Sequence, residues 1–290
     1  MVPGLRVPFF KTAAPWGIVG LLLLPASDHG SRDASTRASL PFMPPPPAML
    51  VVGEELQYKV SYTIFNLGRI IVRVVDRQER NGRVVYRAQA IIDSAPGLPF
   101  VDLHIRFTSE FDEELFSYEW IAEDSTEEKT EVRRLTFDYD SSRVFVEKGT
   151  KTAERSVQFD SRDTVSITEK CQDGFTLFFF ARNHVRQKAT MNTPTFIEKE
   201  QVNTFFNFTN AIEEEEIDSV EYPIEVVEFE GRADFVGVFG LTGGFEGRFT
   251  NDDASVPIVA WMKVILGSIK VTLDQWKRPG WMPPKYLEQD

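Results

Sequence analysis

The chain has few residues of the kinds that catalyse reactions or bind metals. Its histidines are His29, His104 and His184, and its single cysteine is Cys171. A metal site or a proton relay needs two or three such groups to converge, and these positions give no ligand spacing. We therefore predict surface or capping roles for the histidines, and neither a metal site nor a cofactor.

Cys171 is the only candidate for a thiol nucleophile. It lies just before a predicted helix, whose N-terminal dipole could lower the pKa of the thiol. A nucleophile also needs a base, and the nearest histidine in sequence, His184, lies at the far end of that helix. At about 1.5 Å per residue, this places the two side chains more than about 10 Å apart. We therefore interpret Cys171 as a buried structural thiol and predict no catalytic residues.

Two acidic stretches could bind a cation. Residues 213–216 are four consecutive glutamates followed by Asp218, but consecutive side chains of a strand cannot all face one ion, which favours a solvated face. Asn251, Asp252 and Asp253 lack the order of a calcium loop, so we predict a turn. Carboxylates that pair only in space are invisible in one sequence, which leaves a carboxylate-dependent glycan hydrolase as an alternative.

The composition excludes several classes of protein. The 290 residues include 32 Lys and Arg against 44 Asp and Glu, a net charge of -12. A nucleic-acid partner is disfavoured because this balance does not neutralise phosphates, and a surface of this charge would be repelled by anionic lipid headgroups. One cysteine excludes an intrachain disulfide framework and a multi-thiolate zinc site.

The N-terminal residues have the order of a secretory signal. Arg6 and Lys11 precede a mainly apolar run over residues 12–26, which is shorter than the roughly 20 residues of a spanning helix. We predict a signal peptide over residues 1–27, with an uncleaved anchor as the alternative, and no transmembrane span after cleavage. Residues 28–49 end in four prolines before Ala48 and Met49, which predicts an extended disordered linker.

From Glu54 onward, hydrophobic residues alternate with polar ones. Leu56, Tyr58 and Val60 alternate with Gln57 and Lys59, which puts the apolar side chains on one face of a strand. The same pattern recurs in many segments, and Asn-Gly at residues 81–82 is typical of a tight hairpin. Antiparallel strands with one wet face are therefore expected over residues 50–275, followed by an irregular tail over residues 276–290.

One compact helix interrupts the strands. Gln172 or Asp173 can cap it, and Phe175, residues 177–181 and the end at His184 follow. A short helix that is apolar almost all round must be buried. The predicted fold is a single all-β domain, mainly antiparallel: a strongly curved sheet or partly closed barrel with one short Phe-rich helix against its concave side.

Three stretches resemble the bacterial exported family called domain of unknown function 3108. They are residues 53–68 with the Asn-Gly hairpin, residues 173–182, and residues 247–273. The second is similar to that family's Asp-Pro-Leu-Ser-Ala-Leu-Tyr-Tyr-Leu-Arg pattern, with Gly174 in place of the proline and three phenylalanines in place of Leu-Tyr-Tyr. The resemblance covers about residues 53–274. It implies a β-rich protein on the periplasmic or extracellular side of a bacterial envelope, and it assigns no activity or catalytic residues.

The strongest remaining signal is the aromatic excess, with 24 phenylalanines. Most must be core, but a curved sheet with one helix often cannot fill its own concavity. We therefore expect a non-enzymatic envelope protein that binds a lipid or another apolar ligand along Tyr118, Trp120, Phe178 and Phe179. The alternative is a structural or assembly protein that docks to another envelope protein.

Overall fold

A computed structural model describes residues 49–80, 82–98, 102–152, 156–233, 235, 243–264 and 267–288. The predicted signal peptide, residues 28–48 of the predicted linker and Asn81 lie outside these residues. Met49, the last residue of the predicted linker, is fully buried in the core. The elements are β1 (Glu55–Tyr62), β2 (Phe65–Arg80), β3 (Arg83–Ser94), β4 (His104–Asp112), β5 (Ser117–Ser125), β6 (Thr130–Asp138), β7 (Arg143–Lys151), β8 (Val157–Ser166), β9 (Gln172–Asp173), α1 (Thr176–His184), β10 (Ala189–Ile197), β11 (Glu200–Glu215), β12 (Ile224–Ala233), β13 (Gly243–Thr250), β14 (Pro257–Val264) and β15 (Gly267–Lys277).

All strands belong to one sheet, in the order β8-β7-β6-β5-β4-β3-β2-β1-β15-β14-β13-β12-β11-β10-β9. Every pair is antiparallel except β9 with β10. Two meanders, β1 to β8 and β9 to β15, are therefore joined where the first strand pairs with the last. The predicted all-β, mainly antiparallel fold is confirmed.

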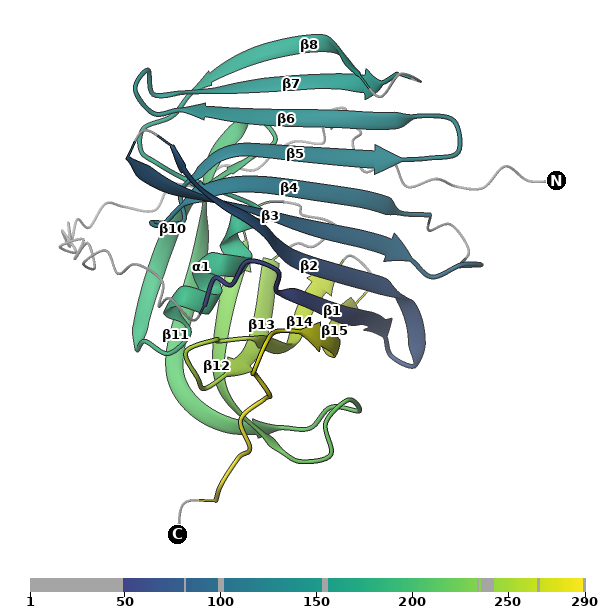
Figure 1. The fold of residues 1–290 in the computed structure, drawn as a ribbon, viewed down its shortest axis with the longest axis vertical. Coiled ribbons are helices and arrows are strands. Elements are labelled where there is room, and N and C mark those ends of the chain that lie inside the picture. Colours follow the sequence, from purple (N-terminus) through teal and green to yellow (C-terminus); the bar gives the residue numbers. More distant parts are fainter. Residues whose placement is uncertain are drawn as a thin grey trace, which may run out of the picture.

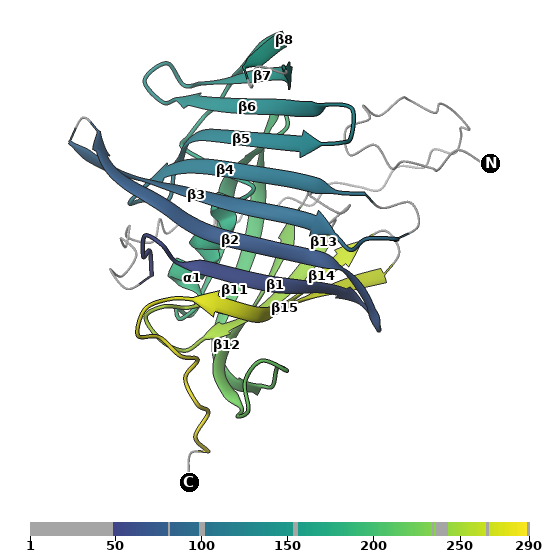
Figure 2. The ribbon, with the colours of Figure 1, turned by 45° about the vertical axis from the view of Figure 1, so that its right-hand side comes forward.

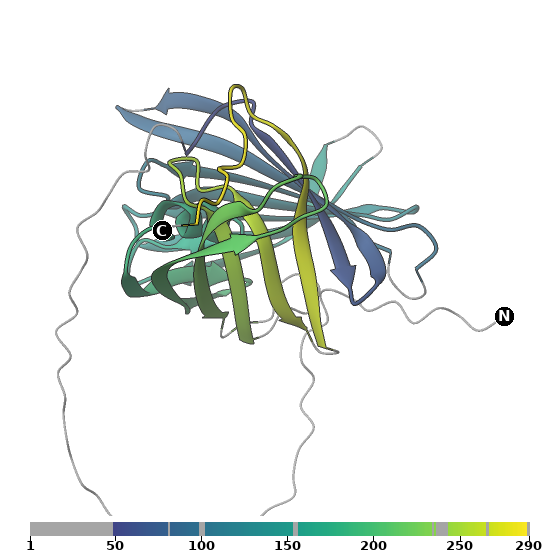
Figure 3. The ribbon, with the colours of Figure 1, turned by 90° about the horizontal axis from the view of Figure 1, so that it is seen from below.

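The sheet bends so that its two halves face each other across α1 (Figures 1 and 3). Its edge strands, β8 and β9, do not pair, so it is a partly closed barrel, as expected. Side chains bridge the opposed halves instead. Phe137 of β6 contacts Phe196 of β10 with ring centroids 5.9 Å apart, and Lys199 binds Asp163 of β8 at 2.6 Å.

Alternation along the strands explains which face is buried. In β1, the side chains of Leu56, Tyr58 and Val60 are buried, whereas Lys59 between them is exposed. The central cluster unites such residues of both meanders with Phe175, which precedes α1, and Phe179 of α1. A second cluster, rich in phenylalanine, packs the other side of the helix against β11, β12 and β13. The helix is thus held between both halves, on the concave side as predicted.

The two ends of the barrel differ, and we name them by what they carry. The helix rim is the end where β1 begins after Glu54, where β15 ends before Arg278, and where Ala254 lies in the β13–β14 turn. The hairpin rim is the opposite end, where Tyr62 closes β1 and Gly267 opens β15. A side chain at Gly267 would meet the ring of Tyr62, so the two turns are neighbours. Figure 2 shows the β1–β2 hairpin beside the ends of β14 and β15.

Candidate functional site

Three inward-facing apolar side chains near the hairpin rim are only partly buried, although the cross-strand partners of two of them, Ile269 and Ile92, are buried. In β1, Leu56 is fully buried at the helix rim, and Tyr62 is only partly buried at the hairpin rim. In β14, Ile258 is fully buried, and Met262 is partly buried. In β2, Ile70 near the hairpin rim is likewise only partly buried. Apolar side chains of the concave face therefore remain within reach of an apolar ligand at this rim.

Two of the four residues predicted to line a ligand site lie together on α1. Phe179 is fully buried, and its ring packs on Phe178, Phe175 and Phe111 at centroid distances of 5.1, 5.5 and 5.0 Å. Phe178 is only partly buried against the same cluster. Phe178 can therefore contact a ligand, whereas Phe179 supports it from behind.

The other two predicted residues lie on β5. Trp120 is partly buried, stacks on Phe107 at 5.5 Å, and joins the same cluster as Phe178. Tyr118 lies elsewhere: its ring packs edge-on against Tyr139, and its hydroxyl donates to Asp112 at 3.0 Å. The structure thus groups Trp120 with Phe178 and Phe179, and gives Tyr118 a separate polar setting.

Sequence reasoning missed the accessible residues near the hairpin rim, Tyr62, Ile70 and Met262. Each lies on the apolar register of its strand, so alternation marks it as inward-facing. Alternation does not reveal which end of a strand the helix covers, and this decides their exposure.

A buried carboxylate fixes the start of α1. Oδ1 of Asp173 accepts the backbone N–H groups of Phe175 and Thr176 at 2.8 and 2.9 Å, and its other oxygen accepts the hydroxyl of Ser117 at 2.7 Å. Asp173 thus binds the first N–H groups of the helix, whereas the N-cap position itself is Phe175, whose side chain makes no cap hydrogen bond. Because the side chain of Asp173 is fully buried, desolvation raises its pKa despite these donors. The carboxylate ties the helix to β5 through Ser117.

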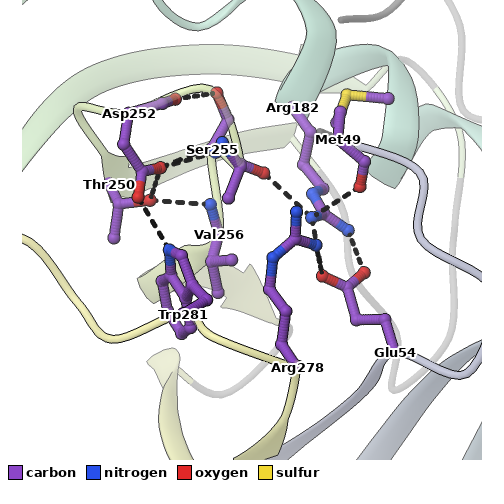
Figure 4. A network of polar contacts seen from close by, with 10 residues as sticks. Met49, Glu54, Arg182, Thr250, Asp252, Ser255, Val256, Arg278 and Trp281 are labelled. Carbon is purple, nitrogen blue, oxygen red and sulfur yellow. Dashed lines mark hydrogen bonds and ion pairs between the residues drawn. The ribbon is translucent and has the colours of Figure 1, made fainter. Parts of the chain in front are cut away.

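A second buried network fixes the end of α1 at the helix rim (Figure 4). Arg182 donates from Nη1 to Oε2 of Glu54 at 2.8 Å, and its Nη2 reaches the carbonyl oxygens of Met49 and Ala254 at 3.2 and 2.9 Å. Arg278 binds the same carboxylate. Burial alone would raise the pKa of Glu54, but the two guanidinium groups outweigh it and hold the pKa below its usual value.

The β13–β14 turn is ordered from within by Asp252, as Figure 4 also shows. Its Oδ1 accepts the N–H of Ser255 at 3.0 Å and the hydroxyl of Thr250 at 2.7 Å, and its Oδ2 accepts the indole N–H of Trp281 at 2.7 Å. The turn predicted here is confirmed, and its acidic residue serves the fold by holding the C-terminal tail against the helix rim.

The residues with catalytic or metal-binding chemistry remain scattered. Cys171 is fully buried, and burial raises the pKa of its thiol to about 12. His104 pairs with Asp93 on an exposed strand face, and His184 bonds the carbonyl of Phe180 within the helix. No group of three His, Cys, Asp or Glu side chains in the described residues could hold a metal ion. No helix in the same part of the chain is both long and apolar enough to cross a bilayer.

A hollow of about 340 Å³ opens on the convex face of the second meander. It is lined by Glu228, Glu246, Gly247, Arg248, Trp261 and Ser268. Arg248 lies over the ring of Trp261 at 5.4 Å and donates to Glu215 at 2.7 Å. The solvated face predicted for residues 213–216 is wrong at Glu215, which is buried because Arg248 and Lys270 pair with it. The hollow contains none of the four predicted aromatic residues.

Comparison with known proteins gives a family without a function. No curated protein matches the chain. Among solved structures, it is similar to a beta-barrel-like protein of domain of unknown function DUF1849 from Brucella abortus. The sequence identity is 10% and the TM-score 0.49, and the match covers 79% of this chain and 98% of the other. The family model described as "Protein of unknown function (DUF3108)" matches residues 57–274, which confirms the resemblance in the sequence. The chain therefore belongs to the DUF3108 family.

Proposed function

We propose that this protein binds an apolar ligand, a lipid or an acyl chain, on the concave face of its sheet and acts without catalysis. The observation that carries the proposal is a group of partly accessible apolar side chains on the concave face near the hairpin rim. Tyr62, Ile70 and Met262 face inward yet stay partly accessible, and they pack against the same cluster as Trp120 and Phe178. A chain laid along them gains about 0.8 kcal/mol for each methylene removed from water.

The clamps at both ends of α1 support this reading. Asp173 and Arg182 bind the helix to the sheet at its start and its end. A helix held in this way keeps Phe178 in place whether or not a ligand is present. The site is therefore preformed, which reduces the entropy lost on binding.

We further propose that the protein works in the bacterial cell envelope after export. The N-terminal charged and apolar order is typical of a secretory signal. Cys171, buried and with a pKa of about 12, suits an oxidising compartment because its thiol is protected from oxidation and disulfide exchange.

The ligand site can be tested with two substitutions in the same strand, β2. Ile70→Glu places a charge on the accessible part of the concave face, and Val75→Glu places the same charge at a position of β2 that is already 41% exposed. Both variants and the parent are titrated with a fluorescent fatty acid. We expect Ile70→Glu to weaken binding at least about tenfold, and Val75→Glu to leave it unchanged.

Extraction of the purified parent with organic solvent and mass spectrometry should also recover an apolar molecule. The proposal fails if no such molecule is recovered and the probe binds Ile70→Glu as tightly as the parent.

The runner-up is an assembly role, favoured by the edge strand β8. This strand has one partner, β7, and most of its side chains are exposed, so its free edge can pair with a strand of another envelope protein. Ser161→Pro would block such pairing. Loss of a copurifying protein in this variant, with fatty-acid binding unchanged, would favour the assembly role.

A further inference from the structure

Ile64, the most exposed large apolar side chain of the described residues, lies beside the exposed Phe65 at the tip of the β1–β2 hairpin. Ile64 is 90% exposed and its neighbour Phe65 is 61% exposed. Tyr62 and Leu67, on either side, are partly buried against the central cluster. Two large apolar residues held in water by an ordered turn are unfavourable unless they meet an apolar surface.

The strand ends that form this tip and the neighbouring turn contain basic residues and no acidic ones, although the protein as a whole is acidic. The chain has a net charge of -12, yet residues 59–70, 261–264 and 267–270 contain no Asp or Glu. They contain four cations: Lys59, Arg69, Lys263 and Lys270. The two turns are neighbours, since Gly267 lies against the ring of Tyr62, so these cations lie on the strands that lead to one apolar tip.

The four cations are accessible. The side chains of Lys59, Arg69 and Lys270 are 57%, 63% and 40% exposed, and Lys263 is exposed as well. Three of them have acidic partners, Asp274, Asp93 and Glu215, and Asp93 lies directly across from Arg69 at the end of β3. The exposed cations Lys59 and Arg69 form pairs that contribute little to stability, so they can turn toward phosphates at small cost, whereas Lys270 also pairs with the buried carboxylate of Glu215.

We propose that the hairpin rim docks on the surface of an anionic phospholipid bilayer. Ile64 and Phe65 enter the boundary between headgroups and acyl chains, and the four cations lie at the level of the phosphates. The net negative charge does not prevent this contact, because screening limits the repulsion from distant acidic residues to about 8 Å at physiological salt.

The docking proposal rests on the proposed ligand site and identifies the bilayer as the source of its ligand. Tyr62, Ile70 and Met262, the accessible inward-facing residues, lie at the same rim as the hairpin tip. A lipid or acyl chain leaving the bilayer there would reach the concave face without crossing water.

The test is sedimentation with vesicles of phosphatidylcholine containing about 30% phosphatidylglycerol. Protein is taken from the soluble fraction of cells, which removes any chain still held to membranes by residues 12–26. We expect the parent to bind, and Ile64→Ser with Phe65→Ser to lower the binding constant at least about tenfold. The matched control is Val75→Ser with Phe145→Ser, which removes two apolar side chains that are 41% and 38% exposed away from the rim. This control should bind like the parent.

Charge is tested separately with Lys263→Glu. We expect weaker binding in this variant, weaker binding of the parent to pure phosphatidylcholine, and a loss of parent binding as salt is raised. The proposal is overturned if the parent does not sediment with anionic vesicles, or if the Ile64 and Phe65 variant sediments like the control. It is also overturned if those substitutions abolish a dimer of the protein and leave vesicle binding unchanged, since the occupant would then be a second copy.

Failure of this proposal can be told apart from failure of the ligand site. The Ile64 and Phe65 variant should hold a fluorescent fatty acid as tightly as the parent at equilibrium and accept it more slowly from vesicles. Ile70→Glu should show the reverse: weak fatty-acid binding and vesicle docking close to that of the parent.

Discussion

Arg182 and Glu54 form an ion pair that is almost completely closed to solvent, with side chains 0% and 1% exposed and Nη1 2.8 Å from Oε2. The two residues are 128 positions apart in the chain. Arg182 lies in the last turn of α1 and Glu54 precedes β1, so the pair ties this helix to the strand at which the two meanders meet. Arg278 completes the pair from the end of β15.

Removal of one partner should therefore destabilise the whole barrel. Arg182→Met leaves a buried carboxylate with Arg278 alone and frees the carbonyl oxygens of Met49 and Ala254, which should lower the free energy of unfolding by about 3 kcal/mol or more. Urea denaturation followed by circular dichroism measures this. The control, Arg69→Met, breaks an exposed ion pair and should change the free energy by less than about 1 kcal/mol. Equal effects of the two substitutions would contradict a structural role for the buried pair.

The raised pKa of Asp173 predicts a pH dependence of stability. The folded protein binds this proton more tightly than the unfolded chain, so the contribution to stability is largest below the ordinary Asp pKa of 3.8 and decreases as pH rises toward the folded-state pKa. Asp173→Asn removes this titration. The free energy of unfolding of the parent minus that of the variant should therefore fall as the pH rises above the ordinary Asp pKa of 3.8. Urea denaturation of both proteins at a series of pH values measures the difference, and a difference that stays constant or rises with pH would contradict the assignment.

Most of the fold could be predicted from local patterns in the sequence. The alternation of Leu56, Tyr58 and Val60 with polar residues marks β1, and the apolar run after Asp173 marks α1, because both signals depend on neighbours in the chain. The family resemblance rests on the same short stretches. These features could be predicted because strand and helix periodicities are properties of one segment at a time.

Contacts between distant segments could not be predicted. Nothing near Glu54 indicates that its partners are Arg182 and Arg278, and nothing near Glu215 indicates that Arg248 will bury it. The exposure of Met262 depends on which end of the barrel the helix covers. The candidate site was therefore only partly found: Trp120, Phe178 and Phe179 share one cluster, and the accessible residues of the hairpin rim were missed.

The thiol of Cys171 should be unreactive in the folded protein. It is fully buried and its pKa is raised to about 12, so almost no thiolate exists at neutral pH. We expect no reaction with a water-soluble disulfide reagent at about pH 8, and one thiol per chain after denaturation in guanidinium, where the pKa returns to about 8.5. Fast labelling of the native protein would show that the segment before α1 opens, and would remove one argument for an oxidising compartment.

Two glycines of β13 should respond in opposite ways to the same substitution. A Cβ at Gly247 would collide with the ring of Phe229, which packs across the glycine in the phenylalanine-rich cluster, whereas a Cβ at Gly244 would meet no atom closer than 3.8 Å. Neither position has a positive φ, so backbone strain does not separate them. Gly247→Ala should lower the free energy of unfolding by about 1–3 kcal/mol, because the aromatic rings around it have no room to move. Gly244→Ala should leave stability unchanged or slightly higher, since alanine restricts the unfolded chain. The urea midpoints of both variants measure these changes in stability. If Gly247→Ala is as stable as the parent, the cluster around Phe229 is loosely packed and has space for a ligand of its own.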